Sequence, residues 1–104
     1  MYYTDLPHGA DAVPSQPGNY IITVGPDNTA IYVGQASDLK ARTLEHLGAN
    51  EKNYCVAREI RKPGARLFFQ VVHSQFERNA VENEWCAKYS PTCNRISPPS
   101  LFGK

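Results

Sequence analysis

The chain has 104 residues, 41% of them hydrophobic, which is enough for one hydrophobic core but not for two. No apolar run approaches the roughly 20 residues that a membrane-spanning helix needs, and the N-terminus lacks the basic start and apolar stretch of a signal peptide. We therefore expect one cytoplasmic, intracellular domain with no membrane partner. The formal net charge of +1 counts modestly against nucleic-acid binding, because proteins of that class are usually strongly basic.

The first 17 residues carry Pro7, Pro14 and Pro17 and show little periodicity, so we expect an extended N-terminal arm outside the core. Residues 19–24 are rich in β-branched and aromatic side chains, which predicts a strand. Gly-Pro-Asp-Asn follows as a turn and leads into a second strand at 29–33. The two strands are predicted to form a hairpin.

The segment after the hairpin predicts a helix that Ser37 caps and that runs to about Leu47, where Gly48 stops it. Leu39, Leu44 and Leu47 would form its apolar face. We further expect a helix at 51–61, a turn at the Lys-Pro-Gly that follows and a strand at 66–73.

The last predicted element is a helix from about residue 76 to residue 89, which Pro91 ends. The predicted order is therefore β-β-α-α-β-α. This order describes an α/β domain over residues 18–95 in which helices flank a small three-stranded sheet, the hairpin plus a third strand. Residues 96–104 would be a C-terminal tail.

The cysteines, Cys55, Cys86 and Cys93, are odd in number and include no CxxC pair. This pattern fits neither a disulfide framework nor a zinc site, and it predicts reduced thiols.

Glu82 is unusual because the helical spacing puts it beside Trp85, Cys86 and Tyr89, on an otherwise apolar side. A buried carboxylate costs several kcal/mol unless it is paired or bound to a cation, so a metal ligand is one interpretation. The other is a boundary glutamate that bends out to water.

Several polar residues recur at fixed spacings along the chain. Gly18-Asn19-Tyr20 is followed by Ile31-Tyr32-Val33-Gly34, then by Arg42 and His46 on one helix face, and finally by Glu82, Pro91 and Asn94. This set resembles the motifs of the GIY-YIG nuclease family. It departs from them at Asn19, where isoleucine is usual, and at Val33, where the change is conservative.

The resemblance implies a role for each polar residue. Tyr20 would orient or deprotonate the attacking water, Tyr32 would help to position it, and Arg42 would stabilise charge on the phosphate. His46 titrates near neutrality and could accept a proton. Glu82 would bind the family's single divalent cation, Mg²⁺ or Mn²⁺. Supporting roles would fall to Gly18 and Gly34, which ease tight turns, and to Asn94, which would brace the site through hydrogen bonds.

A second basic feature lies between the predicted second helix and third strand. It consists of Arg58, Arg61, Lys62 and Arg66, opposed within that stretch only by Glu59. These side chains are candidate contacts to a nucleic-acid backbone, and a solvated helix end explains them equally well.

The sequence thus predicts a divalent-metal-dependent endonuclease that hydrolyses phosphodiester bonds, with DNA as the expected substrate and RNA as the alternative. So small a domain favours structure-directed or nonspecific cutting. One active site would nick one strand per encounter unless the protein dimerises, and a partner protein could supply targeting. The competing hypothesis is an inactive module of the same fold that binds nucleic acid or a partner protein.

Overall fold

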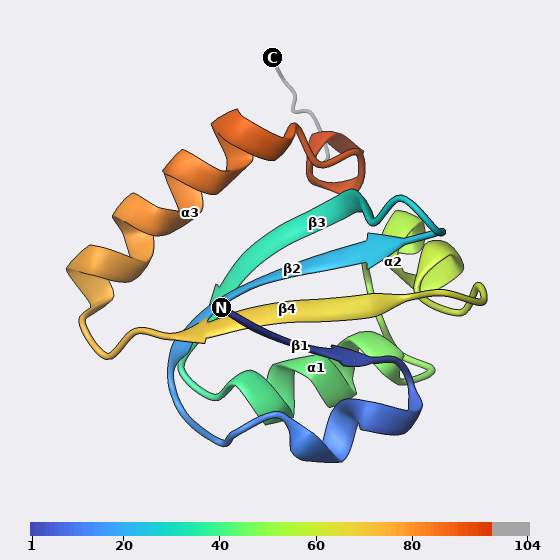
Figure 1. Ribbon diagram of the computed structural model, residues 1–104, viewed down its shortest axis with the longest axis horizontal. Coiled ribbons are helices and arrows are strands. Elements are labelled where there is room, and N and C mark those ends of the chain that lie inside the picture. Colours follow the sequence, from blue (N-terminus) through green and yellow to red (C-terminus); the bar gives the residue numbers. More distant parts are fainter. Residues whose placement is uncertain (97–104) are drawn as a thin grey trace.

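The computed structural model describes residues 1–96, and side chains up to residue 94. The expected tail therefore lies outside the described residues except at its first position. The described elements occur in the order β1 (Tyr2–Asp5), η1 (His8–Ala12), β2 (Gly18–Val24), β3 (Thr29–Ala36), α1 (Leu39–Leu47), α2 (Tyr54–Glu59), β4 (Arg66–Val71), α3 (Gln75–Tyr89) and η2 (Cys93–Ile96) (Figure 1).

The sheet has four antiparallel strands in the order β1-β4-β2-β3, so the predicted α/β class is confirmed but the predicted number of strands is wrong. The extra strand is β1, which pairs with β4 from Tyr2↔Phe69 to Asp5↔Arg66. The expected N-terminal arm was inferred from its prolines, yet all three of them follow β1. Leu6 and Val13 are buried in the core, so this segment is part of the domain.

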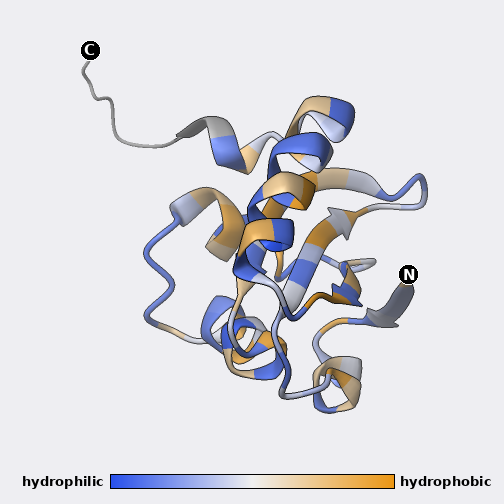
Figure 2. Ribbon diagram, turned by 90° about the vertical axis from the view of Figure 1, so that its left-hand side faces the viewer, coloured by the Kyte–Doolittle hydropathy of each residue, from blue (hydrophilic) through white to orange (hydrophobic). Residues whose placement is uncertain are grey.

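The two faces of the sheet are covered by different helices. In Figure 1, α3 lies along one side of the sheet and α1 along the other. Because side chains alternate along a strand, Tyr20 and Ile22 of β2 join the main core on the α1 side, whereas Ile21 packs with Val33 and Trp85 under α3. The hydropathy colouring in Figure 2 shows apolar residues on the strands and polar residues over much of the helices.

Helix α1 is positioned differently from the predicted helix in two respects. Its N-cap is Asp38, not Ser37, and the Asp38 carboxylate accepts a hydrogen bond from the N–H of Ala41. Its buried face also differs, since Leu44 is exposed and the fully buried positions are Leu39, Thr43 and His46. A hydrophobic pattern could not show this, because two of the buried residues are polar.

A disulfide joins Cys55 of α2 to Cys93 of η2, with 5.3 Å between their Cα atoms, and this corrects the expectation of three reduced thiols. An odd number of cysteines leaves room for one pair, and the fold brings together two residues that are 38 positions apart in the sequence. Cys86 is the free cysteine. Among the helices of residues 1–96, none combines the length and the apolar character that a bilayer crossing requires.

Candidate active site

The two motif tyrosines lie on the same face of the hairpin. In the β2–β3 register Tyr20 is opposite Gly34, and Ile22 is opposite Tyr32, so both phenol rings project toward α1. Their ring centroids are 6.1 Å apart. Tyr20 is buried and Tyr32 is half-buried, which makes Tyr32 the more accessible of the two.

Gly34 makes room for the Tyr20 ring. A Cβ atom at position 34 would lie 2.5 Å from the Tyr20 hydroxyl oxygen and 2.6 Å from Cζ, closer than such atoms can approach. Gly34 lies inside β3 and does not end it, so the expected turn at this position is wrong. Gly18 allows β2 and β4 to approach each other closely, because a Cβ at position 18 would lie 2.2 Å from the backbone oxygen of Gln70 on β4.

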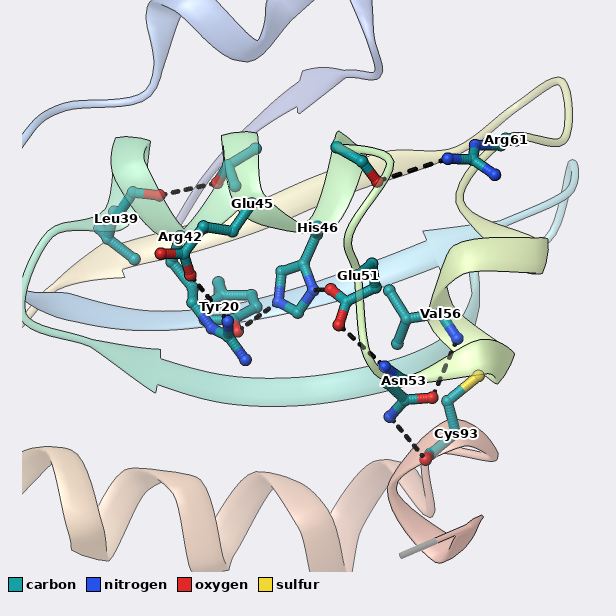
Figure 3. Close-up of polar contacts among 12 residues, drawn as sticks. Tyr20, Leu39, Arg42, Glu45, His46, Glu51, Asn53, Val56, Arg61 and Cys93 are labelled. Atoms are coloured by element: carbon teal, nitrogen blue, oxygen red, sulfur yellow. Dashed lines mark hydrogen bonds and ion pairs between the residues drawn. The ribbon is translucent and has the colours of Figure 1, made fainter.

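His46 connects the tyrosine face to α1. It is 1% exposed, and its Nε2 lies 2.7 Å from the Tyr20 hydroxyl oxygen (Figure 3). The Tyr32 ring meets the imidazole edge-on, with centroids 5.2 Å apart. Burial lowers the pKa of His46 below its ordinary value, although the nearby Glu51 carboxylate opposes this shift. The imidazole is therefore neutral near pH 7 and can accept a proton.

Tyr20 cannot act as a phenolate near neutral pH. Burial raises its pKa well above the ordinary value, the neighbouring Tyr32 adds to the rise, and Arg42 opposes it. A protonated phenol can pass on a proton only when it receives another, so Tyr20 is suited to relaying a proton rather than to holding negative charge.

Arg42 lies beside Tyr20 and His46, on the side that faces solvent. Figure 3 shows its guanidinium group beside the Tyr20 hydroxyl, with Nη1 also 2.8 Å from an oxygen of Glu45. The Arg42 side chain is 38% exposed and borders a surface hollow of about 520 Å³, which is lined by Arg42, Glu45 and residues 48–52. A phosphate entering this hollow would reach the guanidinium fork.

Glu82 lies on the other side of the sheet, on α3, and the sequence prediction of apolar surroundings is only partly correct. Its Oε1 accepts a hydrogen bond of 2.9 Å from Nε2 of Gln35, which projects from β3 toward α3. Gln35 also contacts Asn79 and Gln75 of α3. Glu82 is half-buried at the margin of an amide cluster rather than in an apolar pocket.

The candidate site residues form two groups that lie on opposite sides of β3, the edge strand of the sheet. Tyr20, Arg42 and His46 lie on the α1 side of β3, whereas α3 with Glu82 lies on the opposite side (Figure 3). β3 is the last strand of the sheet. A phosphodiester would have to cross the β3 edge to meet both groups.

The donor set suits a hard divalent cation held weakly by the protein. No cluster of three or more His, Cys, Asp or Glu occurs among the described residues, so Glu82 would be the main protein ligand. Gln35 fixes one of its oxygens, and no further hydrogen bond to Glu82 is found within residues 1–96. Mg²⁺ commonly binds in this way, because it keeps several water ligands and takes others from substrate phosphates.

Asn94 braces the strand that carries Tyr32 and Gly34. Its Oδ1 accepts a 2.8 Å hydrogen bond from the N–H of Val33, and its Nδ2 donates a 2.9 Å bond to the Val33 carbonyl oxygen. The preceding residue, Cys93, is tied to α2 by the disulfide. Together these contacts fix η2 against the edge of β3.

The four basic residues lie away from Tyr20 and are largely paired. Arg58 and Lys62 bond to Glu59, Arg66 bonds to Asp5, and Arg61 donates to the backbone oxygen of Gly48. Arg66 pairs with Thr23 in the sheet, at the end of β2 remote from Tyr20. The structure thus does not bring these cations into the tyrosine group.

Three contacts near the site were not predicted from the sequence, and two of the residues that make them, Glu51 and Gln35, belong to no motif. Glu51, in the loop after α1, bonds to His46, and Gln35 bonds to Glu82. Asn19, the unusual residue of the first motif, is fully buried and donates a 3.0 Å hydrogen bond to the backbone oxygen of Arg78 on α3. No periodicity or motif signals these contacts, since each joins segments distant in sequence or lies in a loop.

Comparisons with known proteins identify relatives of this chain. Residues 16–95 match the family described as the UvrC-like GIY-YIG domain. The chain is 33% identical over 81 residues to UvrABC system protein C of Aquifex aeolicus, covering 78% of this chain but only 14% of that protein.

Two solved structures of the GIY-YIG N-terminal endonuclease domain of UvrC from Thermotoga maritima are also similar. The magnesium-bound form has a TM-score of 0.66 and 25% identity, with 84% of this chain and 92% of that chain covered. A Tyr→Phe point mutant bound to its catalytic divalent cation has a TM-score of 0.63 and 26% identity, with the same coverage.

Proposed function

The chain belongs to the UvrC-like GIY-YIG nuclease family, and on this premise we propose that it is a metal-dependent endonuclease that cuts DNA. The membership confirms the predicted family, and the similar structures confirm the predicted class of fold. The observation that carries the proposal is the hydrogen-bonded contact of Tyr20 with His46 beside Arg42.

The residues on the α1 side would activate water and bind the phosphate. The oxygen of a water molecule attacks phosphorus, while its proton passes to the Tyr20 hydroxyl oxygen and the Tyr20 proton passes to Nε2 of His46. Tyr32 helps to orient the water, and Arg42 neutralises negative charge that builds up on the phosphoryl oxygens. The bond between phosphorus and the 3′ oxygen then breaks, and the leaving oxygen takes a proton from solvent.

A divalent cation held at Glu82, Mg²⁺ or Mn²⁺ with one ion per site, would supply further stabilisation of negative charge on the phosphate. Gln35 supports this role because its amide orients the Glu82 carboxylate toward the β3 edge. Among the described residues no group of three or more His, Cys, Asp or Glu surrounds Glu82. A site with one carboxylate ligand suits a cation that takes its other ligands from water and the substrate.

The proposal extends to the substrate and the mode of cutting. We propose DNA over RNA, structure-directed or nonspecific cutting, and one nick per encounter unless the protein forms a homodimer. The chain spans about a seventh of the length of its UvrC relative. A partner protein that supplies targeting, and a cytoplasmic location, are further parts of the proposal. Arg58, Arg61, Lys62 and Arg66 remain proposed contacts for flanking phosphates. Arg58, Lys62 and Arg66 would first have to open their ion pairs with Glu59 and Asp5.

The test is nicking of supercoiled plasmid by the purified protein in Mg²⁺, in Mn²⁺ and in chelator. Glu82→Ala should abolish cutting, whereas Glu84→Ala, an exposed residue two positions away on the same helix, should not. Open-circular DNA should accumulate before linear DNA. Parent protein that stays folded, binds DNA and never cuts it would instead favour the inactive binding module.

A further inference from the structure

Glu51 is a buried carboxylate in the loop that joins α1 to α2. Its side chain is only 6% exposed, although the loop around it carries the polar residues Asn50, Lys52 and Asn53. Carboxylates are rarely buried unless their oxygens are hydrogen-bonded or paired with a charge. The partners of Glu51 therefore indicate why it is held inside.

Each oxygen of Glu51 meets one donor. Oε1 accepts a 3.0 Å hydrogen bond from the backbone N–H of Asn53, and Oε2 contacts Nδ1 of His46 (Figure 3). Burial by itself would raise the pKa of this carboxyl, but the bond from Asn53 and the proximity of His46 bring it below the ordinary value. Glu51 is therefore ionised near neutral pH and acts only as an acceptor.

An acceptor at Nδ1 determines which ring nitrogen of His46 carries the proton. The neutral imidazole has one N–H, and with a carboxylate against Nδ1 that proton belongs on Nδ1. Nε2 then presents a lone pair, and the Tyr20 hydroxyl 2.7 Å away must donate to it. The second lone pair of the Tyr20 oxygen stays available for a proton from water.

We infer that Glu51 is a positioning residue of this site, which fixes His46 with its proton on Nδ1 so that Nε2 accepts the proton of Tyr20. The inference rests on the proposed nuclease function and names a residue that acts through His46 rather than on the substrate. Three residues from β2, α1 and a loop thus form a hydrogen-bonded chain in the order Tyr20, His46, Glu51, in which the proton moves no further than His46.

The charges around His46 agree with this arrangement. Tyr20 faces it from β2, Tyr32 from β3, Arg42 and Glu45 lie on its own helix, and Glu51 lies in the following loop. Of these groups, Glu51 is the carboxylate in contact with the ring. When His46 accepts a proton during the reaction, the resulting imidazolium would lie against a carboxylate, while Glu51 itself stays ionised.

The diagnostic variant is Glu51→Gln, which keeps the shape of the side chain but has one acceptor oxygen where two are needed. If the amide NH₂ group faces His46, the proton moves to Nε2, which can no longer accept from Tyr20. We expect the single-turnover cleavage rate to fall roughly 100-fold or more while KM changes less than about threefold. Glu77→Gln, exposed on α3, is the matched control and should cut at the parent rate.

The second readout is nitrogen NMR of the His46 ring, which reports the tautomer whether or not the protein cuts DNA. The parent should show a protonated Nδ1 and a bare Nε2, and Glu51→Gln should reverse or mix them. A parent with its proton on Nε2, or a Glu51→Gln variant with unchanged tautomer, would overturn the inference. So would a variant with an altered tautomer that cleaves as fast as an active parent.

The two readouts separate this inference from the proposed function. If the parent cuts no DNA, the nuclease proposal fails while the NMR result still decides the role of Glu51. If Glu51→Gln does not fold, Glu51→Asp takes its place, because it keeps an ionised acceptor on a shorter side chain. Glu51→Asp should retain the parent tautomer and cut at a reduced rate, and loss of that tautomer would contradict the positioning role of Glu51.

Discussion

Replacing Gly34 by alanine should disturb the site through the contact of the new methyl group with the Tyr20 side chain. The added methyl group would lie 2.5 Å from the Tyr20 hydroxyl oxygen, and an ordinary contact begins near 3.4 Å. The hydroxyl must therefore shift by about 0.9 Å or β3 must move away. Tyr20 is 2% exposed and its hydroxyl is bonded to His46, so the ring has little free space into which it can turn.

The magnitude of the effect follows from this displacement. A misplacement of about 1 Å in a reacting group can cost roughly 100-fold in rate. Overpacking of a well-filled core destabilises by about 1–3 kcal/mol. We therefore expect Gly34→Ala to stay folded, to unfold at lower denaturant concentration and to cleave about 100-fold more slowly than the parent.

The assay compares single-turnover cleavage of a labelled DNA duplex with urea unfolding of the same samples. Ala87→Ser, which adds one atom at an exposed position of α3, is the control. In a Tyr20→Phe background Gly34→Ala should cost little further activity, since the displaced hydroxyl is already absent. Folded Gly34→Ala protein that cleaves within twofold of the parent would refute the reasoning.

Three further predictions concern pH, the asparagine brace and the disulfide. Burial holds the pKa of His46 below its ordinary value of 6.5, so the unfolded chain binds a proton there that the folded chain does not. The free energy of unfolding should therefore fall as the pH drops through 6.5, and His46→Gln should remove that part of the slope in urea titrations. Asn94→Ala loses two hydrogen bonds to the Val33 backbone and should destabilise by about 1–3 kcal/mol, whereas the exposed Asn83→Ala should change stability by less than about 0.5 kcal/mol. Reducing the disulfide between Cys55 and Cys93 should lower the free energy of unfolding by about 3–4 kcal/mol and Tm by roughly 12 °C or more. Thiol titration of the unfolded protein should count one thiol before reduction and three after it.

Local sequence signals predicted most elements of the fold. The β2–β3 hairpin follows from β-branched residues around a Gly-Pro-Asp-Asn turn, and α3 lies within one residue of its predicted start. The first strand was missed because its four residues precede a proline-rich stretch and gain stability only by pairing with β4, more than 60 positions later. Pairing over such distances leaves no local pattern.

The sequence predicted the site residues that belong to a motif and did not predict the others. Motif spacing grouped Tyr20, Arg42 and His46, which the structure brings together. The predicted apolar face of α1 was wrong because Leu44 is exposed and the polar His46 is buried. Glu51 and Gln35 belong to no motif. Each is identified only by a hydrogen bond that the tertiary structure creates.

The most direct test of the account is the Mg²⁺-dependent cleavage rate of Tyr20→Phe beside that of the parent. This change keeps the buried ring and removes only the hydroxyl that joins water to His46, and Tyr54→Phe, which alters a tyrosine that is 85% exposed, is the control. We predict a loss of at least about 100-fold for Tyr20→Phe and no loss for Tyr54→Phe. Tyr20→Phe protein that cuts at the parent rate would contradict the proposed role of the Tyr20 hydroxyl in activating water.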